Sequence, residues 1–219
     1  TTTKPTASAQ PLRNTDTGHR LIVDTGNFYQ EQVGREGIAR HELSAQAQRL
    51  EQVQARVENG SRDGLDAEFA CLNLAQSMPV LLPEIQLMAE TLRQFRDVVL
   101  VGIGGSSLGT KAIGQAVTHK ARDDAPHLHY VENVDPYSLD RLLAHLDPAQ
   151  TAVLCISKSG GTIETVVQYL ILRDWLARHL GRDRARRQQW VITDPEQGWL
   201  RNVATREGLS SLPVPPHVG

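Results

Sequence analysis

The chain has 219 residues, of which 40% are hydrophobic and 22% are charged, and its formal net charge is −2. These fractions are ordinary for globular domains, which excludes collagen-like, coiled-coil and wholly disordered chains. No run of about 18 apolar residues is present to cross a bilayer. The near-neutral charge argues against a general nucleic-acid-binding protein. We therefore expect neither a membrane nor a nucleic acid as a partner.

The N-terminal stretch TTTKPTASAQP lacks the apolar segment of a secretory signal. Residues 1–20 are interpreted as a disordered leader because they are rich in Thr, Ser and Pro. Cys71 and Cys155 are too few for a disulfide framework and do not have metal-ligand spacing. The sequence thus predicts a cytoplasmic protein with no metal and no cofactor.

Residues 21–96 are expected to form a helical N-terminal segment. Apolar residues recur every three to five positions over residues 38–58, which predicts one amphipathic helix. Shorter helical patterns cover residues 64–77 and the segment that follows Pro79.

From residue 97 onward, five apolar runs alternate with helical patterns. The runs have the composition of strands buried on both faces. The alternation predicts an α/β fold, a three-layer α-β-α sandwich around a five-stranded parallel sheet. The expected strands are residues 97–103, 127–132, 151–157, 189–193 and 209–214. The expected helices are residues 106–119, 136–146, 162–180 and 196–207.

Two glycine- and hydroxyl-rich loops follow the first and third expected strands, GIGGSSLG at residues 102–109 and SKSGGT at residues 157–162. Ligands of parallel α/β sheets bind at the carboxyl ends of the strands, near the switch in strand order. A helix N-terminus there offers unpaired N–H groups and a positive dipole end. Glycine lets the backbone approach an anion, and Ser or Thr hydroxyls donate to phosphate oxygens. Together the loops predict one pocket for a phosphorylated small molecule.

Two nucleotide-binding motifs fail at a required residue. The dinucleotide pattern G-x-G-x-x-G begins at Gly102 but meets Ser107 where the third glycine is needed. The P-loop pattern begins at Gly104 but continues with Thr110 and Lys111 in place of Lys followed by Ser or Thr. For either loop alone, glycines that merely shape a tight turn are an equal alternative. Two hydroxyl-rich loops at the expected strand ends favour a binding site.

GIGGSSLG after DVVLV, and SKSGGTIET after TAVLCI, resemble the two sugar-phosphate loops of the SIS (sugar isomerase) fold. More closely, they resemble the N-terminal domain of the glucose-6-phosphate isomerase (phosphoglucose isomerase) family, over roughly residues 40–219. The resemblance implies a SIS domain over residues 97–219 with flavodoxin-like strand order, and a helical segment over residues 21–96 packed on it. The terminal VPPHVG looks like the start of the family's next signature. The chain is therefore expected to stop before the second half of the enzyme.

The resemblance also implies the interconversion of glucose 6-phosphate and fructose 6-phosphate, a step of glycolysis and gluconeogenesis, by a full-length homodimer. In the family, the second loop holds the phosphate and the first contacts the sugar. The implied substrate-binding residues are Gly105, Ser106, Ser157, Lys158, Ser159, Gly160, Gly161 and Thr162. The family's catalytic Glu, His, Arg and Lys have no matching position here. The implied behaviour is weak sugar-phosphate binding without turnover.

Two other functions stay open at this point: a non-catalytic SIS domain that regulates in response to a sugar phosphate, and an isomerase of another sugar phosphate. Glu164 is interpreted as a dipole-favoured residue of a helix's first turn, with a general base as the alternative. His127 and His129 face one side of a strand, but two ligands do not make a zinc site. The arginines within residues 182–187 are interpreted as a solvated connecting loop, with an anion or nucleic-acid contact as the alternative.

Overall fold

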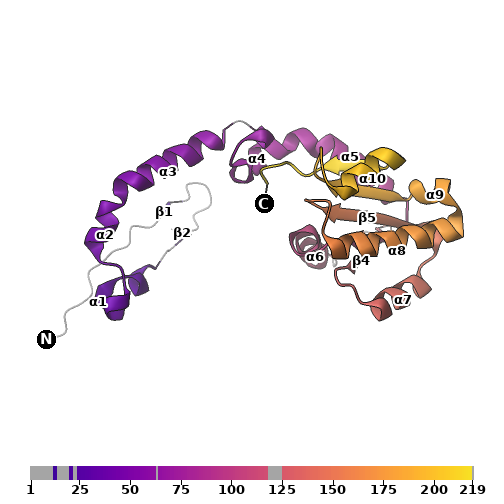
Figure 1. Cartoon of the computed structure of the whole chain (residues 1–219), viewed down its shortest axis with the longest axis horizontal. Helices are drawn as coiled ribbons and strands as arrows, with labels where there is room; N and C mark the ends of the chain where they lie inside the picture. The colour runs from indigo at the N-terminus through magenta and orange to yellow at the C-terminus, as the bar shows by residue number, and fades with distance from the viewer. Residues whose placement is uncertain (1–11, 14–19, 22–23, 63, 118–124, 219) are drawn as a thin grey trace. The chain divides into compact units, whose positions relative to one another are not determined.

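The computed structural model (Figure 1) describes residues 12–13, 20–21, 24–62, 64–117 and 125–218. The chain divides into two compact units, the first ending at Asn59 and the second beginning at Gly60. Most of the expected leader, residues 1–20, lies outside the described residues. Within the described ranges, no helix is both long and apolar enough to cross a membrane.

The first unit consists of short elements. Two strands, β1 (Leu12–Arg13) and β2 (Arg20–Leu21), pair antiparallel. The helices and 3-10 turns that follow are η1 (Gly26–Phe28), α1 (Gln30–Val33), η2 (Gly34–Glu36), α2 (Arg40–Ala45) and α3 (Ala47–Gly60). The prediction of one continuous helix over residues 38–58 is wrong. The helix is interrupted at Gln46, whose N–H donates to the carbonyls of both Leu43 and Ser44 and so tightens the last turn of α2.

The second unit begins with a segment that departs from the predicted helix over residues 64–77. This segment forms η3 (Gly64–Asp66), η4 (Ala70–Leu72) and the short α4 (Leu74–Ser77). The Asn73 side-chain amide donates to the carbonyls of Ser61 (2.5 Å) and Gly64 (3.0 Å), so the chain folds back on itself instead of continuing as a helix. The predicted third helix is confirmed: η5 (Met78–Leu81) leads into α5 (Leu82–Leu92).

The core of the second unit is a five-stranded, all-parallel sheet in the order β4-β3-β5-β6-β7, which confirms the predicted fold class. The strands are β3 (Asp97–Val101), β4 (His127–Val131), β5 (Thr151–Ser157), β6 (Gln189–Thr193) and β7 (Ser210–Pro213). In chain order this is the second strand, then the first, third, fourth and fifth. The strand order reverses between β3 and β5, so the switch point lies at the carboxyl ends of these two strands.

Helices connect the strands: α6 (Gly105–Val117), α7 (Pro136–His145), α8 (Ile163–Leu180) and α10 (Trp199–Glu207). Residues 118 and 119 of the first expected helix lie outside the described residues. The segment after α8 is a short helix, α9 (Arg182–Arg186), drawn in orange in Figure 1, and not the predicted loop. Its Ala185 is 1% exposed and packs in the core, which gives this segment an apolar anchor.

Alternate residues of each strand face two different layers of helices. Val99, Val153 and Val191 pack in the larger core with side chains of α7, α8 and α10. On the opposite face, Val98, Ala152 and Trp190 pack with side chains of α5. The period-two burial of strands between two helical layers explains why the apolar runs are continuous in sequence.

A cluster of polar side chains around the buried Asp97 joins the starts of β3 and β4. The Asp97 carboxylate is 2.8 Å from Nε of Arg96 and 2.8 Å from Nε2 of His129, and Nδ1 of His127 lies 3.6 Å away. Burial raises the pKa of Asp97, but hydrogen bonds from His129 and Arg96 outweigh it, so the pKa lies below its usual value. The two histidines therefore lie beside a structural carboxylate. No group of three or more His, Cys, Asp or Glu among the described residues could hold a metal ion.

Candidate functional site: two hydroxyl-rich loops at the switch point

The two glycine-rich loops meet because β3 and β5 are hydrogen-bonded neighbours although β4 separates them in sequence. Val101 at the end of β3 is in register with Cys155 of β5. Both strands run in the same direction, so the loops that follow them leave the sheet at the same edge. We name the site between these loops the cradle.

The first loop closes directly into α6. The carbonyl of Ile103 accepts from the N–H of Ser106 (3.3 Å), and Gly105 is the first helical residue. Ser106 is half-buried, and its neighbour Ser107 is fully buried. Ser107 Oγ donates to Oε1 of Glu132 (2.7 Å) at the end of β4, which fixes the loop against the neighbouring strand. A hydrogen bond from Lys111 (2.5 Å) and one from Ser107 hold the pKa of Glu132 below its usual value, so this anchor is ionised.

The second loop turns sharply after β5. The N–H of Gly160 donates to both the carbonyl and the Oγ of Ser157 (3.2 Å each), and the N–H of Gly161 donates to Oγ of Ser159 (3.3 Å). Gly160 has a φ of +64°, a left-handed conformation that favours glycine. Thr162 occupies the N-cap position of α8, but its side chain makes no capping hydrogen bond. Its hydroxyl can therefore donate to a ligand.

The segment between β6 and α10 packs against the backbone of the second loop and supports it. The sequence reasoning missed this feature. The N–H of Asp194 donates to the carbonyl of Lys158 (3.0 Å), and the N–H of Leu200 donates to the carbonyl of Gly160 (2.9 Å). The backbone of Gly198 lies against the carbonyl of Ser159, where an added Cβ would come within 2.3 Å of the oxygen. The sequence placed Gly198 inside the expected helix of residues 196–207, but α10 begins only at Trp199, and Gly198 is its N-cap.

The cradle encloses a cavity of about 300 Å³. Five of the predicted binding residues line it: Ser106, Ser157, Lys158, Ser159 and Thr162. The predicted Gly105, Gly160 and Gly161 belong to the same loops but are not among the lining residues. Lining residues that the sequence reasoning did not name are Ile103, Ile156, Thr165 and Asp194. The exposed Glu164 lies in the first turn of α8, outside the lining.

The electrostatics of the cradle suit an anion at one side and hydroxyl groups at the other. The N-terminus of α8 carries a partial positive charge of about one half, and its first N–H groups lack helical partners. The carboxylate of Asp194 accepts from the N–H groups of Glu196 (2.8 Å) and Gln197 (2.9 Å), which hold its pKa below its usual value. An ionised carboxylate accepts hydrogen bonds only, so Asp194 suits sugar hydroxyls and not a phosphate.

Fold and loops together define an α/β domain of the sugar-isomerase class. A family model described as phosphoglucose isomerase matches residues 54–197. The chain belongs to the phosphoglucose isomerase family.

Curated relatives match stretches of different length. The glucose-6-phosphate isomerase of Thermus thermophilus is 43% identical over an alignment of 140 residues, which covers 59% of this chain and 32% of that protein. The glucose-6-phosphate isomerase of Rubrobacter xylanophilus is 41% identical over 128 residues, 56% of this chain and 30% of that protein. The one from Carboxydothermus hydrogenoformans is 27% identical over 207 residues, 91% of this chain and 44% of that protein. The chain thus spans less than half the length of these relatives.

Solved structures show the same fold. A hypothetical protein from Thermus thermophilus superposes with a TM-score of 0.67 at 36% identity, covering 82% of this chain and 41% of that one. A glucose-6-phosphate isomerase from Chlamydia trachomatis superposes with a TM-score of 0.56 at 24% identity, covering 65% of this chain and 26% of that one.

Proposed function

We propose that this chain is the sugar-phosphate-binding part of a glucose-6-phosphate isomerase, and that it binds glucose 6-phosphate and fructose 6-phosphate. The observation that supports this most directly is the meeting of two hydroxyl-rich loops around one cavity at the switch point. The phosphate would occupy the loop of Ser157, Ser159 and Thr162 at the start of α8. The sugar would extend toward Ser106 and Asp194.

The chain alone is proposed to bind without turnover. Aldose–ketose isomerisation moves a proton between two carbons, and this needs a general base whose pKa lies near the working pH. Among the described residues that line the cradle, Asp194 is the one carboxylate, and backbone hydrogen bonds lower its pKa. A carboxylate that holds its charge so firmly is a weak base for a carbon acid. A cytoplasmic location, a homodimeric full-length form and a SIS domain beginning at residue 97 also remain predictions.

Calorimetric titration of the 219-residue chain tests the binding. Glucose 6-phosphate and 6-phosphogluconate should bind, and glucose should not, because the phosphate contributes most of the affinity. The double variant Ser159→Ala/Thr162→Ala removes two phosphate donors, each worth about 1.5 kcal/mol or more toward a charged acceptor. It should weaken binding about 100-fold or more. Ser44→Ala, which removes an exposed hydroxyl in the first unit, is the matched control. Equal affinity for glucose and glucose 6-phosphate would refute the proposal.

A coupled assay tests the second half of the proposal. The chain is incubated with fructose 6-phosphate, and glucose 6-phosphate is detected with a dehydrogenase. Turnover above the uncatalysed background would contradict the absence of a competent base. Titrations with mannose 6-phosphate and glucosamine 6-phosphate then decide the sugar preference.

A further inference from the structure

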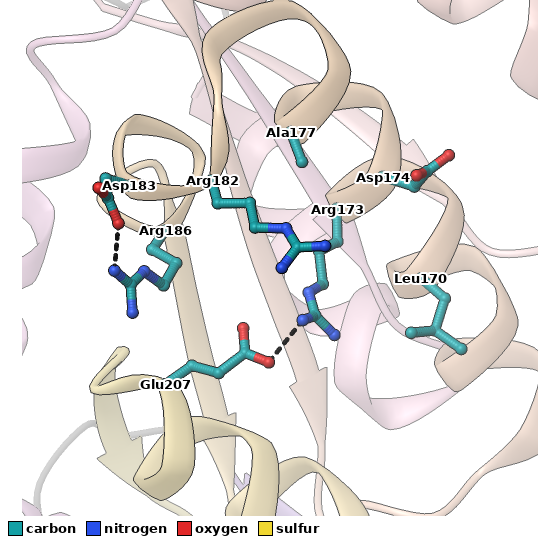
Figure 2. Close-up of a pocket in the computed structure, with 8 residues that line it drawn as sticks. All are labelled: Leu170, Arg173, Asp174, Ala177, Arg182, Asp183, Arg186 and Glu207. Carbon is teal, nitrogen blue, oxygen red and sulfur yellow. Dashed lines mark hydrogen bonds and ion pairs between the residues drawn. The ribbon is translucent and has the colours of Figure 1, made fainter.

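A second cavity, of about 530 Å³, lies among α8, α9 and the end of α10 (Figure 2). It shares no lining residue with the cradle. Arg173 follows Thr162 by eleven residues in α8, a separation of about 16 Å along a helix that rises 1.5 Å per residue. The charged residues that line the cavity are Arg173, Asp174, Arg182, Asp183, Arg186 and Glu207.

The carboxylates of this cavity are already neutralised by arginines. The ion pairs are Glu207 with Arg173, Asp183 with Arg186, and Asp174 with Arg178. Glu207, whose side chain is 12% exposed, also lies 3.4 Å from Arg206. With Arg182, five arginines surround three carboxylates in the described structure. The lining itself holds three arginines and three carboxylates, and the excess positive charge comes from Arg178 and Arg206, which lie outside the lining and pair with Asp174 and Glu207.

Arg182 is the lining arginine that stands apart from these ion pairs. Figure 2 shows its side chain running across the cavity toward Arg173. Within the described part of the chain, no ion pair or hydrogen bond joins its guanidinium to another group. Two guanidinium groups that point into one cavity repel each other, and an anion placed between them would replace that repulsion with attraction. The guanidinium fork matches phosphate oxygens in a bidentate arrangement.

The shape of the cavity limits the class of anion. Its volume lies within the range of small-molecule sites and leaves room beyond a single phosphate. Leu170 and Ala177 supply apolar lining on the side of α8. The cavity is open to solvent on the side of α9, where Arg182 and Asp183 are exposed. Its few arginines do not form the extended basic surface by which the backbone of a nucleic acid is recognised.

We propose that Arg173, Arg182 and Arg186 form a binding site for a phosphorylated small molecule that carries a di- or triphosphate group. The site goes beyond the proposed isomerase function and is independent of the cradle. A bound polyphosphate would bridge α8 and α9, since it would touch arginines of both helices.

A purely structural role for the arginines makes a different prediction. Cations near the C-terminus of a helix are stabilised by its dipole, and Arg178 and His179 already occupy the last turn of α8. Arg182 follows Gly181, the C-cap of that helix. If Arg182 only completed this arrangement, Arg182→Gln would lower stability without changing the binding of any anion.

The test is a calorimetric titration of the full 219-residue chain with inorganic pyrophosphate, at low salt and again at 0.2 M salt. The unmodified chain and the Ser159→Ala/Thr162→Ala chain are titrated first, and every arginine variant is then made in the latter background, so that uptake by the cradle is not counted. Arg182→Gln should weaken pyrophosphate binding at least tenfold. Arg184→Gln, an exposed arginine of α9 outside the cavity lining, is the matched control and should change it less than twofold. Arg182→Lys, which keeps the charge and loses the fork, should give an intermediate affinity.

Several results would overturn the site. One is that pyrophosphate does not bind detectably, or that its binding disappears in the Ser159→Ala/Thr162→Ala background. Another is that Arg182→Gln leaves the affinity unchanged, or lowers it no more than Arg184→Gln does. None of these results bears on glucose 6-phosphate binding, so the proposed function can stand or fall separately. Tryptophan fluorescence checks that each variant is folded.

Discussion

Gly198 offers the sharpest test of how the second loop is held in place. Its φ of +98° and ψ of 158° fall in a region that is essentially restricted to glycine. An added Cβ would lie 2.3 Å from the carbonyl oxygen of Ser159 and 3.2 Å from its carbonyl carbon. Both atoms are backbone and cannot rotate away. Gly198→Ala should therefore destabilise the second unit and displace the phosphate-binding loop.

The expected magnitude has two parts. The backbone conformation costs a non-glycine residue about 1–3 kcal/mol, and inserting a methyl group into a filled space costs about 1–3 kcal/mol. A total near 4 kcal/mol is a large share of the typical stability of a domain, about 5–15 kcal/mol. Gly208→Ala is the matched control at the other end of α10. Gly208 has a φ of +64° with no atom within 4 Å of an added Cβ, so it should cost only about 1–2 kcal/mol.

Urea unfolding followed by tryptophan fluorescence measures this difference. The three tryptophans all lie in the second unit, so the signal reports that unit alone. With an m-value of about 2 kcal/mol/M, Gly198→Ala should lower the midpoint by about 2 M and Gly208→Ala by about 0.5–1 M. Gly198→Ala should also weaken glucose 6-phosphate binding under native conditions, and Gly208→Ala should not. Equal stability and equal ligand affinity in the two variants would refute the supporting role of Gly198.

Three further outcomes follow from buried polar groups. Ser107→Ala removes a buried donor to the ionised Glu132 and should lower the unfolding free energy by about 1–2 kcal/mol in urea. The pKa of Asp97 lies below the unfolded value of about 3.9. Its ion cluster therefore stabilises the fold above that pH and is lost as the pH falls through the folded pKa. The thermal midpoint of the wild type should fall more steeply from pH 5 to pH 3 than that of Asp97→Asn. Burial raises the pKa of the Cys155 thiol to about 12, whereas Cys71 is exposed. A thiol reagent at pH 8 should therefore label only Cys71 in the native chain and both cysteines in urea.

Each of these outcomes has a result that contradicts it. Ser106→Ala is the control for Ser107→Ala, because the hydrogen bond to Glu132 comes from Ser107 and not from the half-buried Ser106. Equal losses in the two variants would remove the special role of Ser107. Parallel pH profiles for the wild type and Asp97→Asn would show that the cluster does not control acid stability. Rapid labelling of both thiols in the native chain would mean that the core around Cys155 opens readily.

The sequence was sufficient for the sheet and for the position of the cradle. Strands buried on both faces are continuous apolar runs, and helix starts are marked by local signals such as Asp135 before Pro136. These signals are local, so each strand and most helices of the sheet were predicted. The helical N-terminal segment, residues 21–96, was harder to predict. The break at Gln46 and the fold-back at Asn73 depend on particular hydrogen bonds, which apolar periodicity does not encode.

The tertiary structure alone decided what surrounds the two loops. Asp194 and Gly198 lie more than thirty residues beyond the second loop in sequence, and the pairing of β5 with β6 brings them against it. The same holds for Arg182 and Glu207, which come to one cavity because α9 and α10 lead into adjacent strands. Hydrogen bonds and ion pairs form between groups that are close in space. A sequence specifies those neighbours through the whole packed sheet and not through any local pattern of residues.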